Sequence, residues 1–394
     1  MTPELLVAGG GIGGLAAALA ATRAGCTVRV FEQAAEFAEI GAGIQLGPNA
    51  TRLLHGWGLE PALAQVAAAP QRLVVRRVGD GARLAVLALG AAFAARYGAP
   101  YLTVHRAVLH GVLLRAAAAA GASLQTGQRI VQFSQPEAVV RLELEDRREI
   151  EGDVLVVADG IWSRLRAQLL GDGPAHATGH LAYRALLDQR TLPQHLRSQE
   201  VCVWLGPHSH TVAYPVRGGE SLNLVVVVEG GVLQPLLEWG AQAAGADLQA
   251  VLGGVCKELQ ELVQAAAQWG VWSLHERAPV HSAEAMAQGR VALLGDAAHP
   301  MRPYLAQGAA MALEDAAELA RVLTMVDGRV VDVPLALRRY ALNRWQRCAR
   351  VQRVAQRNAS VFHATGPLQW GRDAALRLLG RRLLDQPWLY GGPN

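Results

Sequence analysis

The chain has 394 residues and a formal net charge of +4, with 51% hydrophobic and 18% charged residues. This composition is typical of a packed globular protein and excludes a disordered chain, and the length provides core for two or three domains. No apolar run is long enough to span a bilayer, and the arginines are dispersed, so we expect neither a membrane span nor nucleic-acid binding.

The four cysteines are scattered along the chain without a C-x-x-C pair. Their spacing argues against a disulfide framework and against a zinc site, so we expect no metal. The first motif begins within ten residues of Met1, which leaves no room for a signal peptide. We therefore expect a cytoplasmic enzyme.

The first predicted element is a βαβ unit over residues 1–33. An apolar strand at 5–8 runs into a glycine turn and an alanine-rich helix, and a second strand follows at 27–31. The N–H groups at the start of such a helix, together with its positive dipole end, bind phosphate. The unit is therefore expected to bind a dinucleotide.

Four residues of this unit carry that expectation, because Gly9, Gly11 and Gly14 fit G-x-G-x-x-G and Glu32 follows the second strand. Gly9 allows the tight turn, and Gly11 lets the backbone approach a pyrophosphate. Gly14 lets the helix pack close to the strand, and Glu32 accepts a ribose hydroxyl. The motif alone does not separate NAD from FAD.

The next elements are predicted from hydrophobic pattern and turn residues. In chain order we expect a glycine-rich loop and helix at 41–57, strands within 72–90, a helix at 106–121, strands near 123–133 and 138–145, and a buried parallel strand at 154–158. Then come strands at 201–205, 211–216 and 222–229, a helical stretch at 246–267, a strand at 290–294 and mostly helix to about 384.

These elements predict an α/β fold, in which a Rossmann-like domain carries an inserted domain with a mixed or antiparallel sheet, followed by C-terminal helices. The expected nucleotide-binding domain takes 1–70, 101–179 and 280–360, the inserted substrate domain takes 71–100 and 180–279, and a helical tail covers 361–394.

Two further motifs lie where predicted strands end. Asp159-Gly160 stands within ADGIWSRLR, and Gly295-Asp296 stands within LLGDAAHP. Open α/β sheets bind ligands at the carboxyl ends of their strands, although each pair alone indicates only a turn. Asp296 can accept a hydrogen bond from a sugar or ribityl hydroxyl, and Gly308 starts a helix whose positive end can face a flavin ring.

In this order the three motifs resemble the fingerprints of the single-component FAD-dependent aromatic hydroxylases, with the p-hydroxybenzoate hydroxylase fold. The resemblance extends from residue 5 to about 360. The segments GAGIQLGPNA, RYGAPYLTVHR and PYLAQGAAMALEDA are most similar to the 3-hydroxybenzoate 6-hydroxylase and salicylate hydroxylase branch. The resemblance implies that a phenolic aromatic acid is hydroxylated with FAD, NADH or NADPH, and O₂, through a flavin C4a-hydroperoxide. Members often form dimers, so a homodimer is a further expectation.

The resemblance also implies roles for single residues. Glu32 would hold the adenosine ribose, Arg106 the flavin side, Asp296 the ribityl or pyrophosphate region, and Asp159 would serve FAD binding and NAD(P)H use. The cofactor residues implied in this way are Gly9, Gly11, Gly14, Glu32, Gln33, Gln45, Arg106, Ile130, Asp159, Asp296, Gly308 and Ala309. Val108 stands where related chains carry Asp, and its effect is expected to be local.

Ring hydroxylation favours a phenolate, so a base with a pKa near working pH is needed, and histidine suits this. His210 and Tyr214 are four apart on a predicted strand and so share a face, and the family binds and activates its substrate with a His and a Tyr at this spacing. Tyr304 and Gln307 follow the Gly-Asp strand and are expected over the flavin. Gln45 is expected to contact cofactor or substrate.

The substrate stays open at this point. Pro303 stands where related 3-hydroxybenzoate 6-hydroxylases carry Gln, and related salicylate and hydroxynicotinate hydroxylases carry His at the position of Tyr304. The alternatives are a hydroxylase of an N-heteroaromatic such as hydroxynicotinate, a flavin oxidase or reductase without hydroxylation, and a non-catalytic nucleotide-binding protein. Three other residues are expected to be structural or peripheral: Trp204, His208 and His299.

Overall fold

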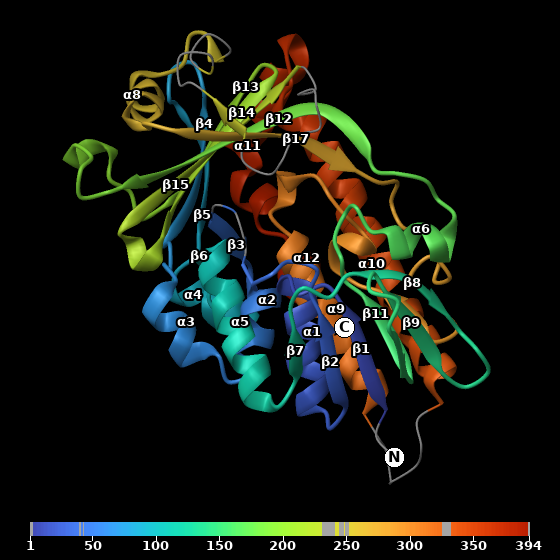
Figure 1. The fold of residues 1–394 in the computed structure, drawn as a ribbon. Helices are drawn as coiled ribbons and strands as arrows, with labels where there is room; N and C mark the ends of the chain where they lie inside the picture. The colour runs from blue at the N-terminus through green and yellow to red at the C-terminus, as the bar shows by residue number, and fades with distance from the viewer. Residues whose placement is uncertain are drawn as a thin grey trace.

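The protein is described by a computed structural model over residues 3–38, 41, 43–230, 241–243, 248, 252–324 and 332–392. Two sheets dominate it, a six-stranded one in the lower part of Figure 1 and an eight-stranded one across the top. Helix α10 (Val333–Phe362) packs against β18 and β19 of the lower sheet. Among the described helices, none combines the length and apolarity that a bilayer span requires.

The six-stranded sheet has the order β18-β19-β11-β1-β2-β7, parallel from β19 to β7 with β18 antiparallel at the edge. Its strands are β1 (Glu4–Ala8), β2 (Thr27–Phe31), β7 (Ser123–Gln125), β11 (Val154–Val157), β18 (Ala287–Gln288) and β19 (Val291–Leu293). All four residues of β11 are buried between β1 and β19, so the prediction of a central parallel strand from the continuous apolar run is confirmed.

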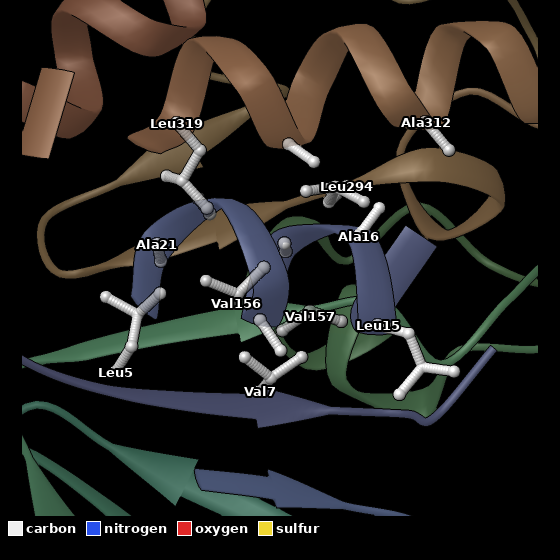
Figure 2. Close-up of a cluster of buried hydrophobic side chains, with 14 of the residues drawn as sticks. Leu5, Val7, Leu15, Ala16, Ala21, Val156, Val157, Leu294, Ala312 and Leu319 are labelled. Carbon is white, nitrogen blue, oxygen red and sulfur yellow. The ribbon is translucent and has the colours of Figure 1, made fainter. Parts of the chain in front are cut away.

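Small side chains let two helices pack closely over this sheet. Helices α1 (Ile12–Arg23) and α9 (Gly308–Leu323) are in close contact, and Figure 2 shows Ala16 and Ala312 among the side chains in this part of the core. A Cβ on Gly14 would lie 1.9 Å from the carbonyl oxygen of Gly9, so only glycine allows α1 to begin this close to β1.

The eight-stranded sheet has the order β16-β17-β12-β15-β14-β13-β4-β5, antiparallel except for the parallel pair β13–β4. Its strands are β4 (Arg72–Arg77), β5 (Arg83–Ala88), β12 (His176–Asp188), β13 (Val201–Gly206), β14 (Ser209–Val216), β15 (Ser221–Glu229), β16 (Ala241–Ala243) and β17 (Trp269–Glu276). Both segments expected in the inserted domain contribute strands to this one sheet.

The remaining elements surround the two sheets. The small sheets contain β3 (Gly43–Leu46) with β6 (Leu102–His105), and β8 (Ile130–Ser134), β9 (Val140–Leu144) and β10 (Glu149–Gly152). The other helices are α2 (Pro48–Gly56), α3 (Glu60–Val66), α4 (Ala91–Tyr97), α5 (Arg106–Ala120), α6 (Arg164–Leu170), α8 (Lys257–Ala265), α11 (Gly366–Leu384) and α12 (Pro387–Tyr390), with short 3₁₀ turns η1 (Gln194–Leu196), η2 (Arg217–Gly219), η3 (Gly295–Ala297) and η4 (Pro303–Leu305).

The structure differs from two predicted elements and contains one long strand that was not predicted. The expected glycine-rich loop contains β3, because this segment pairs with β6 from far along the chain. Strand β12 was not predicted, although Leu181, Tyr183, Ala185 and Leu187 alternate along it and are buried on one face. Within the expected helical stretch 246–267, α8 occupies the second half, while 246, 247 and 249–251 lie outside the described residues.

A buried ion network joins α9 to α10. Arg344, 1% exposed, donates to Glu314 Oε2 at 2.8 Å and to Asp315 Oδ1 at 2.7 Å. Arg347 donates to both oxygens of Glu314, at 2.6 and 2.7 Å. Burial alone would raise the pKa of Asp315, but His299 and Arg344 outweigh it and lower that pKa to about 2. Asp315 is therefore ionised at neutral pH.

The same network reaches three other parts of the chain. The Gly295 N–H donates to Asp315 Oδ2 at 3.1 Å, which ties the Gly-Asp turn to α9. Asn49 of α2 donates to Glu314 Oε1 at 2.9 Å. Arg347 donates to the carbonyl oxygens of Trp388 and Leu389 in α12, at 2.8 and 2.9 Å. The C-terminal segment therefore docks on its own subunit.

Replacing Arg344 by Met is expected to lower the free energy of unfolding by about 3–5 kcal/mol, because two buried carboxylates lose a partner. Denaturant unfolding followed by circular dichroism measures the change. Arg339→Met is the matched control, because Arg339 is exposed on the same helix, and it should shift stability by less than about 0.5 kcal/mol. Similar small changes in both variants would contradict the role given to the network.

Candidate functional site

The glycine turn joins β1 to α1 in the way that G-x-G-x-x-G predicts. Gly9 has a φ of +105°, and a Cβ there would lie 2.5 Å from the carbonyl oxygen of Ala158. Gly11 precedes α1, no side chain caps this helix, and no acidic residue stands in its first turn. Backbone N–H groups at the start of α1 are therefore available to a phosphate.

Glu32, directly after β2, holds the backbone around the glycine turn. Its carboxylate accepts hydrogen bonds at 2.7 and 2.8 Å from the N–H groups of Gly10 and Ala34. The Gln128 N–H donates to the carbonyl oxygen of Glu32 at 2.8 Å, which brings the loop before Ile130 to the same end of the sheet. The neighbouring Gln33 is exposed. Each carboxylate oxygen keeps a further lone pair, so Glu32 can still accept a ribose hydroxyl.

Asp159 follows β11 and lies against the glycine turn, since a Cβ on Gly9 would be 3.0 Å from the Cα of Asp159. Its Oδ1 is buried and has no hydrogen-bond partner among the described residues. Burial raises the pKa of Asp159 to about 6, although Ser163 and Arg277 act in the opposite direction. A buried, unpaired carboxylate oxygen at the carboxyl ends of β1 and β11 matches a ligand that brings a hydrogen-bond donor.

The Gly-Asp turn meets the start of α9. Asp296 is exposed in η3, and a Cβ on Gly308 would lie 3.9 Å from its Oδ1. Gln307 precedes α9, and no side chain caps the helix. The structure thus brings Asp296 together with Gly308 and Ala309 at a second uncapped helix N-terminus, which favours negative charge.

Helix α5 supports the glycine turn from another side. Arg106 begins this helix, and a Cβ on Gly41 would lie 3.0 Å from its Cδ. His110, which the sequence did not single out, is buried and lies 2.8 Å through Nε2 from the carbonyl oxygen of Gly10. Val108 packs partly buried against the main hydrophobic core, so the position that is Asp in related chains serves packing here.

The face of the eight-stranded sheet carries a cluster of histidines and Tyr304. His210 is 3% exposed, and its Nδ1 lies 2.8 Å from Nε2 of His363. Its ring is 4.9 Å from the ring of Tyr304, whose hydroxyl is hydrogen-bonded to Nδ1 of His180. Burial, and then His363 and His180, hold the pKa of His210 well below its usual value, so the imidazole is neutral at physiological pH.

Tyr214 shares the sheet face of His210 but does not join this cluster. Four residues along a strand place it about 13 Å away. Its hydroxyl donates to the carbonyl oxygen of Gly43 in β3 at 2.6 Å. Gln45, also in β3, accepts from the Tyr101 hydroxyl at 2.7 Å. Tyr214 therefore holds β3, the strand that carries Gln45.

The side chain of Gln307 is buried and hydrogen-bonded within the protein. It is 3% exposed, and its Oε1 accepts from Nδ2 of Asn49 at 3.0 Å, which extends the buried network of Glu314. The residues expected to be structural or peripheral follow that expectation: Trp204 is 1% exposed, His208 lies on an exposed turn, and His299 is buried beside Asp315 at 2.5 Å.

The positively charged side chain of Arg184 lies on the same sheet face as His210. The guanidinium of Arg184, on β12, lies 4.2 Å from the centre of the Trp272 ring, and its Nε is buried without a hydrogen-bond partner among the described residues. Burial lowers the pKa of Arg184 to about 10, with a contribution from Arg106, while Tyr214 raises it. Arg184 is therefore charged at neutral pH and well placed to receive an anionic group.

Four residues at this sheet face were not predicted from the sequence: His180, Arg184, Glu229 and His363. They come from β12, β15 and the end of α10, and none belongs to a motif, so only the tertiary arrangement shows them. Two groups of residues also place potential metal ligands within 4.8 Å of one another, namely His180, Glu229 and His363, and His299, Asp315 and Cys348. Within both groups, some of these atoms already hydrogen-bond to one another.

The residues at the strand ends fit FAD. The glycine turn has no room for side chains, Asp159 offers an unpaired oxygen, and two helices begin uncapped beside them. With an enclosed histidine cluster on a second sheet, the fold and the site define an FAD-binding oxidoreductase.

Comparison with known proteins gives the family. Residues 2–353 match the family model described as an FAD binding domain. A 3-hydroxybenzoate 6-hydroxylase from Polaromonas naphthalenivorans (strain CJ2) is 37% identical over 393 residues, which cover 98% of this chain and 95% of that protein. A 6-hydroxynicotinate 3-monooxygenase from Bordetella bronchiseptica is 38% identical over 364 residues, 90% of this chain and 91% of that protein. The crystal structure of Klebsiella pneumoniae HpxO with FAD and uric acid superposes with a TM-score of 0.85 at 26% identity, covering 97% of this chain and 95% of that chain.

The chain belongs to the FAD binding domain family. It is an FAD-dependent aromatic monooxygenase that uses NAD(P)H and O₂. The resemblance on which the sequence analysis relied, the fold class and the cofactors are thereby confirmed.

Replacing Asp296 by Ala is expected to weaken FAD binding about 10- to 100-fold, because a hydrogen bond to a charged group contributes about 1.5–3 kcal/mol. The FAD content of the purified protein and a fluorescence titration of the apoprotein measure this. Asp146→Ala, an exposed carboxylate in the turn between β9 and β10, is the control and should keep full occupancy. Equal occupancy in both variants would remove Asp296 from the FAD site.

Proposed function

We propose that this enzyme hydroxylates a phenolic aromatic acid of the 3-hydroxybenzoate type. The observation that carries the proposal is that a neutral buried imidazole and a guanidinium whose Nε has no partner among the described residues lie on one sheet face. On β15, which lies between β14 and β12, Val227 pairs with His210 and Val225 pairs with Arg184. His210 and Arg184 are therefore two strands apart and offset by two residues, which separates their Cα atoms by about 12 Å. An aromatic ring that carries both a hydroxyl and a carboxylate matches these two residues, with the hydroxyl at His210 and the carboxylate at Arg184.

The relatives support the same substrate class. The Polaromonas relative is named for 3-hydroxybenzoate, and the Bordetella relative is named for 6-hydroxynicotinate. Both names describe a hydroxylated aromatic acid, so Arg184 suits either, and the N-heteroaromatic remains the second candidate. The hydroxybenzoate is preferred because the 3-hydroxybenzoate 6-hydroxylases recur among the relatives, also in Aquipseudomonas alcaligenes and Klebsiella oxytoca.

In the proposed reaction, His210 takes the proton of the ring hydroxyl, because a phenolate carbon reacts more readily with activated oxygen. Arg184 holds the carboxylate and so orients the ring, and Tyr304 packs beside His210. When bound, FAD would supply the redox chemistry, which takes electrons from NAD(P)H and activates O₂. The buried cluster keeps water from the reacting groups.

The same proposal assigns the cofactor and substrate contacts. The eight-stranded sheet serves as the substrate domain, with His210, Tyr214 and Tyr304 at the substrate side and Gln45 and Gln307 at the edge between substrate and cofactor. FAD is held by Gly9, Gly11, Gly14, Glu32, Gln33, Gln45, Arg106, Ile130, Asp159, Asp296, Gly308 and Ala309. The two uncapped helix N-termini support this placement.

The proposal also includes a cytoplasmic homodimer. All four cysteines are free thiols, which suits a reducing compartment. Helix α11 exposes a set of large apolar side chains that a second copy would cover: Leu368, Trp370, Leu378, Leu379 and Leu383.

Light scattering should find a wild-type dimer, because the exposed side chains of α11 gain by burial. Leu378, 82% exposed, is the test position, and Leu378→Asp is expected to give a monomer. Asp146→Ala, away from this helix, should leave the mass unchanged. A monomeric wild type would contradict the dimer.

Mass spectrometry of the products from 3-hydroxybenzoate, salicylate and 6-hydroxynicotinate tests the activity, and we expect a dihydroxybenzoate from 3-hydroxybenzoate with its carboxylate retained. Arg184→Met should raise the KM for 3-hydroxybenzoate about 10- to 100-fold, because an ion-paired hydrogen bond is lost. The neutral analogue 3-hydroxybenzyl alcohol should show no such rise. Exclusive turnover of 6-hydroxynicotinate would favour the second candidate, and NADH oxidation without any hydroxylated product would contradict the function.

A further inference from the structure

His210 is the inner end of a line of hydrogen bonds that reaches the surface. Its Nδ1 lies 2.8 Å from His363 Nε2, and His363 Nδ1 lies 3.0 Å from Glu229 Oε1. The other oxygen of Glu229 lies 2.7 Å from Nδ1 of His208. Side-chain exposure increases from 1% at His363 to 36% at Glu229 and 68% at His208. The line therefore connects a buried imidazole with solvent.

We propose that Glu229 and His363 form a proton relay, which fixes the tautomer of His210 and carries the proton of the substrate hydroxyl to solvent. The proposal rests on the proposed function, because it takes His210 as the base. Glu229 and His363 are positioning residues, since they act through His210 and not on the substrate.

The hydrogen bonds assign the tautomers one after another. A carboxylate only accepts, so His363 must carry its proton on Nδ1 toward Glu229. In the neutral imidazole the Nε2 of His363 is then an acceptor, so His210 must donate from Nδ1. The Nε2 of His210 keeps its lone pair, and this is the atom that can take a proton from the substrate.

The proton steps balance. The O–H bond of the substrate breaks as an N–H bond forms at His210 Nε2, and the proton on His210 Nδ1 passes to His363 Nε2. The proton on His363 Nδ1 passes to Glu229, which releases it to solvent. Reprotonation of the product phenolate runs the same steps backward and restores both tautomers, and no electrons are exchanged.

The backbone holds the relay in register. His363 follows the last turn of α10, and its carbonyl oxygen accepts from the N–H of His208 at 3.2 Å. The N–H of Glu229 donates to the carbonyl oxygen of His208 at 2.8 Å. The end of α10, the turn before β14 and the end of β15 are thereby joined independently of the side chains, so removing one imidazole should leave the others in place.

The charges around the relay favour neutral imidazoles. Burial lowers the pKa of His363 to about 4, although Glu229 raises it, so the base His210 and its partner are both uncharged near neutral pH. The titratable and charged groups that face the cluster come from β12, β14, β15, β17, η4 and the end of α10, and they are His180, His208, His210, Glu229, Glu276, Arg302, Tyr304 and His363.

The test compares His363→Ala and Glu229→Gln with two reference variants in the FAD-loaded enzyme. His210→Ala removes the proposed base, and His195→Ala removes an exposed histidine that also pairs with a glutamate, Glu261 at 2.6 Å, at a distance from the site. Three quantities are measured: kcat between pH 5 and pH 9 with 3-hydroxybenzoate, its response to added imidazole, and the stopped-flow rate at which bound 3-hydroxybenzoate ionises in oxidised enzyme without NADH.

We expect His363→Ala to lower both kcat and the ionisation rate about 100-fold, and imidazole to restore them in proportion to its neutral form. Glu229→Gln should lower kcat about tenfold and move the acid limb of its pH profile to lower pH, because a carboxylate that stabilises the imidazolium is lost. His195→Ala should match the wild type.

Two outcomes would overturn the relay. Wild-type kcat and ionisation rate in His363→Ala and Glu229→Gln, with His210→Ala inactive, would remove the relay and keep the base. Loss of FAD or of substrate affinity in His363→Ala without imidazole rescue would assign His363 a purely structural role. Full activity of His210→Ala would instead contradict the proposed function itself.

Discussion

The arrangement of the site depends on the buried pairing of Glu314 and Asp315 with Arg344. These two carboxylates hold α9 against α10, and through Gly295 and Asn49 they also hold the Gly-Asp turn and α2. In the proposed function the uncapped N-terminus of α9 faces FAD, and His363 follows the end of α10. One desolvated ion network thus joins α9, α2 and the Gly-Asp turn to α10.

The two sheets contribute different parts of the site. The six-stranded sheet presents its strand ends to an anionic dinucleotide, with glycine turns, an Asp159 oxygen that has no partner among the described residues, and uncapped helices. The eight-stranded sheet presents a face with a neutral imidazole at one place and a guanidinium at another. A base must be unprotonated to take a proton, and burial keeps His210, the proposed base, neutral. An anion-binding group needs the reverse, and Arg184 keeps its charge because guanidinium loses a proton only at much higher pH.

The sequence allowed the fold class and the cofactor to be predicted, because both are marked by local patterns. Gly9 is required by its positive φ and Gly14 by its contact with Gly9 in the same turn, and the apolar run of β11 indicates a buried parallel strand. The substrate side was predictable only in part. His210 was proposed from a spacing and stays a proposal, while His363 and Glu229 meet it only because α10 returns to the sheet, and no local pattern encodes that contact. Strand β12 was also missed, although its alternating residues Leu181, Tyr183, Ala185 and Leu187 are buried on one face, with His180 and Arg184 on the other.

The central claim is that a phenolic acid lies between His210 and Arg184 on the eight-stranded sheet, facing FAD at the N-terminus of α9. A crystal structure of the FAD-loaded enzyme with 3-hydroxybenzoate tests it most directly. The account predicts the ring hydroxyl within hydrogen-bond distance of His210 Nε2 and the carboxylate on the guanidinium of Arg184. A carboxylate bound at His210 with Arg184 facing solvent, or a ligand away from this sheet face, would contradict it.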